Sequence, residues 1–118
     1  MSKVLVVDDA QEMTRVVAEV LSAQHDVRIA NRGQEALACA MSFIPEVALI
    51  DLAMPTMSGY EVARRLRRSL GHAIRLVAFT GYDVLPTQVA AVDFDGVLRK
   101  PASSEELLRT ISPAAPAD

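Results

Sequence analysis

Residues 47–51 read VALID, four apolar residues followed directly by Asp51. A short run of this kind is typical of a strand that is buried on both faces of a sheet. Residues 4–7, which read VLVV, form a second such run, and this run closes on Asp8 and Asp9. The two runs predict central strands of a parallel sheet, each ending in carboxylates.

The alternation of strand and helix patterns continues along the rest of the chain. Strands are predicted at residues 4–7, 26–30, 47–50, 74–79 and 96–99. Helices are predicted at residues 12–21, 34–42, 59–70 and, weakly, 86–92, and a last helix begins at the capping-box pair Ser103 and Glu106 and ends at Ile111. Five strands alternating with five helices predict an α/β fold, a doubly wound five-stranded parallel sheet with right-handed crossovers and helices on both faces.

Apolar side chains at helical spacing identify the helix faces that are expected to be buried. The first helix has Met13, Val16, Val17, Val20 and Leu21 in this stripe, and the second has Ala36, Leu37, Ala40 and Met41. In the second strand, Val27 and Ile29 share one face. His25 and His72 lie near predicted loops and are expected to be solvated.

Length and composition indicate one folded domain. The chain has 118 residues, of which 51% are hydrophobic and 23% are charged, and such values are ordinary for a globular protein. The formal net charge of −3 argues against a nucleic-acid binder. The arginines at positions 64, 65, 67 and 68 are interpreted as a solvated helix surface. Cys39 is the single cysteine and cannot form an internal disulfide.

The two ends of the chain add expectations about its surroundings. No apolar run approaches the roughly 20 residues that span a bilayer, and the first strand begins too early for a signal peptide, so we expect a cytoplasmic protein. Residues 1–112 are predicted to form the domain, and the Pro/Ala-rich residues 113–118 form a tail or the start of a linker. If they begin a linker, an output domain or a kinase belongs to a longer protein.

Polar residues follow the central strands of the predicted sheet. The first strand ends at Asp8 and Asp9, the third at Asp51, the fourth at Thr80 and the fifth at Lys100. Each has a plain alternative interpretation as a helix cap, a turn residue, a strand end or a solvated charge. Because ligands bind at the carboxyl ends of the strands in open parallel sheets, their joint occurrence favours a site.

The residue types in this predicted site suit phosphoryl transfer. Three carboxylates in one cleft repel one another, and Mg²⁺ is a suitable cation because it prefers hard oxygen ligands. Asp51 can act as the nucleophile that forms an acyl phosphate. Lys100 and Thr80 can neutralise and orient the transferred group.

The chain resembles the receiver domain of two-component response regulators from Lys3 to about Ile111. The segments that carry the resemblance are VLVVDD at 4–9, LIDLAMPTMSGYE at 49–61, AFTG at 78–81 and LRKP at 98–101. The resemblance implies the flavodoxin-like strand order 2-1-3-4-5. It also implies a phosphohistidine donor on a sensor histidine kinase or a histidine phosphotransfer protein, self-catalysed phosphorylation, and a readout by conformational change or phosphorelay. A homodimer is possible, whereas no nucleic-acid or membrane partner is expected for this chain.

The resemblance implies a role for each site residue. Asp51 is the phosphoacceptor. Mg²⁺ is held directly by Asp9, Asp51 and the backbone carbonyl of Ala53, while Asp8 acts through a water. Lys100 pairs with Asp51 or the phosphoryl group, and Thr80 bonds a phosphoryl oxygen. The peptide bond between Lys100 and Pro101 is expected to be cis.

Val97 departs from the family pattern. Many receivers have Tyr or Phe three residues before the lysine, and that ring moves inward when the threonine shifts. Val97 has a short, stiff side chain and no ring to move. We therefore expect the signal to leave through Gly81 to Gln88, where Tyr82 lies two residues after Thr80.

Three other functions were weighed against the receiver interpretation. A phosphatase or phosphotransferase of the haloacid dehalogenase type needs a second aspartate two residues after the nucleophile, where this chain has Ala53. A flavodoxin-type flavin module needs a Ser/Thr/Gly-rich loop after the first strand, where this chain has Asp8, Asp9 and Ala10. A pseudo-receiver that only binds partners is disfavoured by the intact set of site residues.

Overall fold

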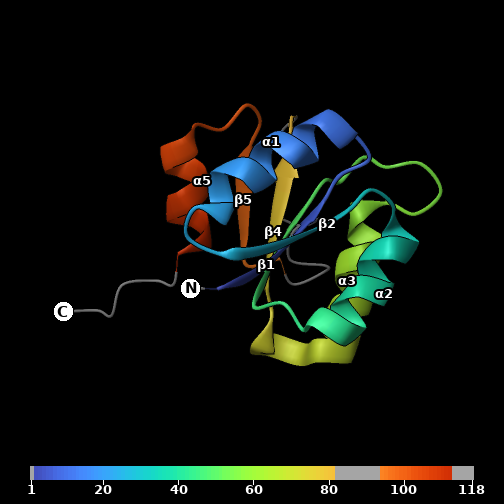
Figure 1. The fold of residues 1–118 in the computed structure, drawn as a ribbon. Coiled ribbons are helices and arrows are strands. Elements are labelled where there is room, and N and C mark those ends of the chain that lie inside the picture. Colours follow the sequence, from blue (N-terminus) through green and yellow to red (C-terminus); the bar gives the residue numbers. More distant parts are fainter. Residues whose placement is uncertain (1, 82–93, 113–118) are drawn as a thin grey trace.

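The computed structural model describes residues 2–81 and 94–112, and all five predicted strands are present in one parallel sheet. The strands are β1 (Lys3–Val7), β2 (Asp26–Ala30), β3 (Val47–Ile50), β4 (Arg75–Thr80) and β5 (Gly96–Arg99). Their order is β2-β1-β3-β4-β5, and all neighbouring pairs are parallel, as Figure 1 shows. The predicted α/β fold and strand order are confirmed.

Helices cover both faces of this sheet. They are α1 (Gln11–Ser22), α2 (Gly33–Phe43), α3 (Gly59–Leu70), the short 3-10 helix η1 (Gly71–Ala73) and α5 (Ser104–Ile111). In Figure 1, α1 and α5 lie on one side of the strands, and α2 and α3 lie on the other. The predicted helix at residues 86–92, most of the Gly81 to Gln88 segment, and the tail at 113–118 lie outside the described residues.

Two apolar clusters separate cleanly across the sheet because successive strand residues point to opposite faces. Leu5 and Val7 of β1 belong to the cluster under α2 and α3. Val4 and Val6 of the same strand belong to the cluster under α1 and α5. All four are at most 1% exposed, so β1 is a central strand that is buried on both faces, as its uninterrupted apolar run predicted.

The ends of the later helices follow from local sequence signals. Ser58 caps α3 by accepting a hydrogen bond from the backbone N–H of Glu61, and Gly71 ends it at a φ of 63°. The predicted capping box of α5 is present between Ser103 and Glu106. The 3-10 turn η1 after α3 was not predicted, since its three residues form no apolar pattern.

Several predicted burial positions are wrong. Val16 is 57% exposed because the inward row of α1 contains Thr14, Val17 and Leu21 instead. The hydroxyl of Thr14 donates to the backbone carbonyl of Gln11, so this polar residue can be buried.

Other exposed apolar residues lie at the margins of the fold. Met41 is 51% exposed near the end of α2, and Ile29 is 42% exposed on the edge strand β2.

His25 is only 8% exposed, contrary to its predicted solvation, because the backbone N–H of Ser2 donates to its Nδ1 at 3.1 Å. None of the helices in the described part of the chain combines the length and the apolar character needed to cross a membrane.

Candidate functional site

The parallel hydrogen-bond ladder brings the strand ends to a common level. The backbone N–H of Asp8 donates to Ala30 at 3.1 Å, and that of Asp51 donates to Val7 at 2.8 Å. The backbone N–H of Lys100 donates to Thr80 at 2.8 Å across the last two strands. The polar residues that end β1, β3, β4 and β5 therefore meet at the carboxyl edge of the sheet.

Three carboxylates converge at this edge. One oxygen from each of Asp8, Asp9 and Asp51 lies within 4.8 Å of the others. Asp8 is 1% exposed and Asp51 is 7% exposed, whereas Asp9 is exposed. The group is thus a small acidic pocket with two buried walls and one open side.

Lys100 supplies the positive charge of this pocket. Its Nζ lies 2.6 Å from Asp8 Oδ2 and 3.6 Å from Asp51 Oδ1. The ammonium also lies 5.1 Å from the centre of the Phe79 ring. Pairing of Lys100 with Asp51 or the phosphoryl group was expected; the contact with Asp51 is present, and a shorter contact with Asp8 accompanies it, so the lysine bridges the two buried acids.

Asp51 carries a strongly perturbed carboxyl group. Burial raises its pKa to about 6, and the negative charge of Asp8 adds to this effect. Lys100 and a hydrogen bond from the backbone N–H of Ala53, 3.4 Å from Asp51 Oδ1, act in the opposite direction. Asp9 contributes a smaller upward effect. The raised pKa shows that Lys100 and the Ala53 hydrogen bond do not fully offset burial and the neighbouring acids.

The loop after Asp51 is held by a close approach of two backbone segments. The Gly59 N–H donates to the carbonyl of Leu52 at 3.0 Å, and a Cβ at Gly59 would lie only 2.1 Å from the backbone oxygen of Asp51. Only glycine fits there without moving the backbone of Asp51. Gly59 is therefore part of what positions this carboxylate.

The sequence analysis missed two residues that support the site. The side-chain amide of Asn31 donates to the backbone carbonyl of Asp8 at 2.8 Å and to Thr14 Oγ1 at 3.1 Å. Asn31 directly follows β2, so the rule used for the other strand ends would have found it. Thr14 gave no such signal, because it lies among the apolar residues of α1.

The other predicted positions are placed as follows. Thr80 is fully buried at the end of β4, and Ala53 is exposed beside Asp51. The peptide bond between Lys100 and Pro101 is cis. Val97 is 44% exposed on β5, where it pairs with Ala78 of β4.

The donor set suits a hard divalent cation. Carboxylate oxygens are the ligands that Mg²⁺ prefers, and a site for it commonly uses one or two carboxylates together with water and phosphate. The exposed Asp9 leaves one side of the pocket open for such ligands. Burial and the negative charge of Asp8 raise the pKa of Asp51, and a bound cation would favour its ionised form.

Comparison with known proteins gives a consistent answer. Residues 4–112 match the family model described as the response regulator receiver domain. The response regulator MprA of Mycolicibacterium vanbaalenii is 36% identical over 109 residues, which are 90% of this chain and 47% of that protein. The MprA of Mycobacterium leprae is 35% identical over 92% of this chain and 49% of its own length. The chain thus spans about half the length of the curated relatives it matches.

Solved structures agree with the sequence relatives. The chemotaxis protein CheY4 of Vibrio cholerae superposes with a TM-score of 0.86 at 34% identity, covering 93% of this chain and 95% of CheY4. A CheY-like receiver domain protein of Methanospirillum hungatei superposes with a TM-score of 0.87 at 25% identity, covering 94% and 90% of the two chains. With the family match over nearly its whole length and this shared fold, the chain belongs to the response regulator receiver domain family.

Proposed function

We propose that Asp51 accepts a phosphoryl group from a phosphohistidine on a sensor histidine kinase or a histidine phosphotransfer protein. The observation that carries this proposal is the gathering of three carboxylates within 4.8 Å, with the Lys100 ammonium bridging the two buried ones. Asp51 ends a central strand, and its carboxyl group is the one with a pKa raised to about 6. Above that pH it is ionised and nucleophilic.

The transfer exchanges one bond to phosphorus for another. An oxygen of the Asp51 carboxylate forms the new P–O bond, and the P–N bond of the donor breaks. The departing imidazole keeps the electron pair of that bond and takes up one proton. The product is an aspartyl phosphate, and no oxidant or reductant is required.

The protein's own residues promote this step mainly by position and charge. Asp9, Asp51 and the Ala53 carbonyl would hold Mg²⁺ directly, with Asp8 acting through water. When bound, the cation neutralises charge on the phosphoryl oxygens. Lys100 supplies a second positive charge, and the Thr80 hydroxyl is proposed to bond a phosphoryl oxygen once Asp51 is modified. This is the sense in which we propose that phosphorylation is self-catalysed.

The surroundings of the domain are proposed from the same set of residues. Residues 1–112 form the receiver, and the Pro/Ala-rich residues 113–118 form a tail or the start of a linker. We place the domain in the cytoplasm, where it would meet a phosphohistidine donor. The absence of an aromatic at Val97 supports an exit of the signal through residues 81–88. Amide exchange with beryllofluoride that changes only at residues 97–99 would contradict that route.

Intact mass after incubation with a small acyl phosphate tests the proposed function. With Mg²⁺ the mass should rise by one phosphoryl group, and without Mg²⁺ it should not change. Asp51→Asn should abolish the increase. Asp26→Asn, at the amino end of β2 on the opposite edge of the sheet, is the matched control and should be modified like the wild type. Equal modification of Asp51→Asn and wild type would refute the proposal.

A further inference from the structure

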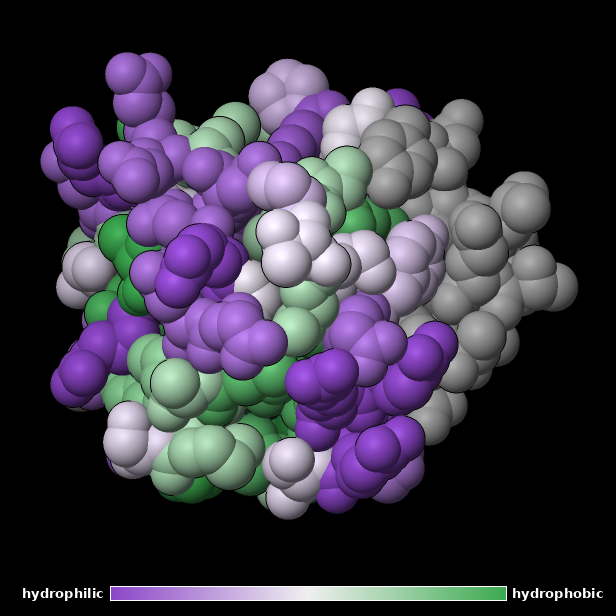
Figure 2. Space-filling model, turned by 90° about the vertical axis from the view of Figure 1, so that its right-hand side faces the viewer, coloured by the Kyte–Doolittle hydropathy of each residue, from purple (hydrophilic) through white to green (hydrophobic). Residues whose placement is uncertain are grey.

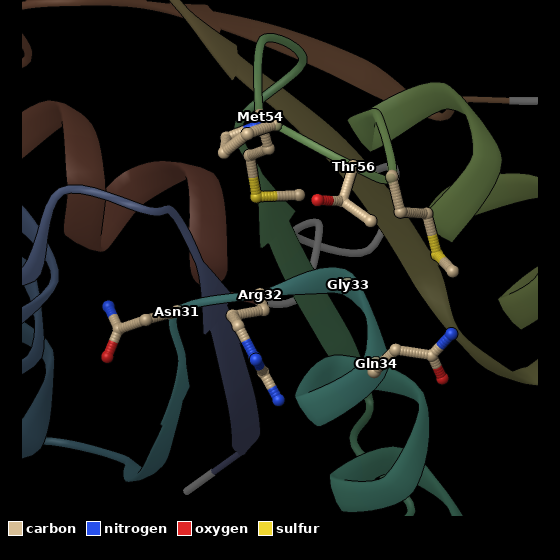
Figure 3. Close-up of a pocket in the computed structure, with 8 residues that line it drawn as sticks. Asn31, Arg32, Gly33, Gln34, Met54 and Thr56 are labelled. Atoms are coloured by element: carbon tan, nitrogen blue, oxygen red, sulfur yellow. The ribbon is translucent and has the colours of Figure 1, made fainter.

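A small cavity lies between two loops at the carboxyl edge of the sheet, beside the acidic pocket. It is lined by residues 31–34, which lead from β2 into α2, and by residues 54–57, which follow Asp51. Figure 3 shows the side chains of Met54 and Thr56 reaching from the second segment toward the first. Its volume is about 150 Å³.

The lining of this cavity is mostly apolar. Met54 and Met57 are each 9% exposed, and Pro55 and Gly33 add further apolar surface. The described residues that line it include no carboxylate, and the guanidinium of Arg32 at its rim lies 3.7 Å from Glu35. The cavity therefore offers methionine sulfurs and hydrocarbon rather than an unpaired charge, so an uncharged ligand fits it best.

The volume and the sulfurs narrow the class of ligand. Cavities of about 150 Å³ with apolar walls hold a molecule of the size of benzene. Methionine side chains adapt to irregular shapes and make favourable contacts with aromatic rings. An apolar ligand group that displaces poorly ordered water gains affinity.

Both walls of the cavity are connected to the acidic pocket, the first by a hydrogen bond and the second through the chain. Asn31, in the first wall, donates to the backbone carbonyl of Asp8 at 2.8 Å. The second wall begins directly after Ala53, whose N–H donates to Asp51 Oδ1. A molecule between the walls would touch the segments that hold both buried carboxylates.

We propose that this cavity is a binding site for an uncharged molecule with a single aromatic ring, placed to act on the receiver from outside its phosphoryl site. The proposal goes beyond the phosphorylation of Asp51 and does not depend on it. The segment at its mouth already departs from ordinary geometry, since Thr56 has a φ of 70°.

A titration of protein labelled with ¹³C in its methionine methyl groups tests the proposal, with benzyl alcohol as the probe. The chain has five methionines, so each signal can be followed separately and assigned with Met→Leu variants. The Met54 and Met57 signals should shift in a saturable way because the ring lies against them. Met41, which is 51% exposed on α2, is the internal control and should not follow the same curve.

A two-ring alcohol, naphthalene-2-methanol, distinguishes specific binding in the cavity from nonspecific binding to an apolar surface. In the wild type it should bind at least about tenfold more weakly than benzyl alcohol, because two rings exceed the cavity volume. Met57→Ala enlarges the cavity and should reverse that order if the variant folds. Joint, unsaturated shifts of all methionines, or stronger binding of the two-ring alcohol to the wild type, would overturn the proposal.

Discussion

The two ends of the sheet handle charge in opposite ways. At the amino end, Arg75 donates to the backbone carbonyls of Thr110, Ile111 and Ser112 at the end of α5. Arg67 likewise donates to the carbonyls of Gly71 and Ile74, each at 2.8 Å. Cations therefore lie where helix carbonyls place partial negative charge, and each such contact is favourable.

At the carboxyl end, like charges are gathered instead. Asp8, Asp9 and Asp51 share one pocket, and in the described part of the chain the cation that contacts Asp8 and Asp51 is Lys100. The N-terminus of α1 offers some relief, since the backbone N–H of Ala10 donates to Asp8 Oδ1 at 3.0 Å. The difference indicates that the charged groups at the amino end stabilise the fold, whereas the gathered carboxylates at the carboxyl end cost stability.

Figure 2 shows that hydrophilic and hydrophobic residues are mixed on the surface over α2 and α3. Glu61 on α3 pairs with Arg64 at 3.1 Å and with Arg65 at 2.8 Å. These exposed pairs agree with the interpretation of the arginines at 64, 65 and 68 as a solvated surface. Arg67 is the exception, because its side chain is only 10% exposed and contacts Asp95 at 2.8 Å.

Removing Arg67 should have the largest effect on stability. Burial opposes ionisation of Asp95, but hydrogen bonds from the Leu76 N–H and from Arg67 outweigh it, so its pKa lies below its usual value. Arg67→Ala removes one of the two donors to this carboxylate, which keeps the Leu76 N–H, and removes the side-chain donor to two carbonyls. We expect a loss of about 2–3 kcal/mol in the free energy of unfolding, measured with urea. Arg64→Ala, on the exposed face, should stay within about 0.5 kcal/mol of wild type, and an equal loss in both would contradict the contrast between these arginines.

Neutralising Asp51 should increase the free energy of unfolding, the opposite of the effect of removing Arg67. The folded protein raises this pKa to about 6 from the ordinary value of 3.8, so the folded state holds the proton more tightly than the unfolded state. This group therefore favours folding at low pH and costs stability as pH rises through about 6. Asp51→Asn should raise the free energy of unfolding by about 1–3 kcal/mol near pH 8, measured by urea denaturation.

The pH dependence provides the control for this prediction. The difference between Asp51→Asn and wild type should shrink below about pH 6 and vanish near pH 4, where both carry a neutral side chain. A variant that is less stable than wild type at about pH 8 would show that Asp51 is a structural residue rather than a strained one.

The affinity for Mg²⁺ tests which of the acids at the carboxyl end bind the cation. We expect Mg²⁺ to bind in the millimolar to sub-millimolar range, about −4 to −6 kcal/mol. Asp9→Ala should weaken Mg²⁺ binding by about tenfold, since the exposed Asp9 lies at the open side of the pocket. Calorimetric titration checks this, with Glu12→Gln in the first turn of α1 as the control. Unchanged affinity in Asp9→Ala would remove Asp9 from the ligand set.

Replacing His25, which lies at the amino end of the sheet, should have the smallest effect on stability. Burial lowers its pKa, with the N-terminal charge also contributing, and its Nδ1 accepts the hydrogen bond from Ser2 in the neutral form. The unfolded state thus takes up the proton more readily, and stability falls as pH drops below about 6.5. Relative to His25→Gln, the wild type should lose about 1 kcal/mol in acid. His72→Gln, at an exposed position, is the control variant.

The fold could be predicted because its signals are local and redundant. Uninterrupted apolar runs marked β1 and β3, and a Gly and a capping box marked the ends of α3 and the start of α5. The site could be located because one topological rule collects the residues after each strand. Burial of individual side chains was harder, since it depends on partners distant in sequence.

Two residues show where such predictions were wrong, and a third shows where they were incomplete. Thr14 replaced Val16 in the core of α1 because its hydroxyl found partners in Gln11 and Asn31. His25 is buried because the start of β1 supplies a donor from Ser2. Lys100 lies closer to Asp8 than to Asp51, and no pattern of spacing distinguishes these two acids.

Chemical mapping of the modified carboxylate tests most directly whether the carboxyl end is built around Asp51. After incubation with Mg²⁺ and a small acyl phosphate, borohydride reduces an aspartyl phosphate to homoserine, and tandem mass spectrometry then identifies the altered residue. Homoserine is predicted at position 51 alone, with Asp8 and Asp9 unchanged. Homoserine at position 8 or 9, with Asp51 intact, would contradict the assignment of Asp51 as the phosphoacceptor.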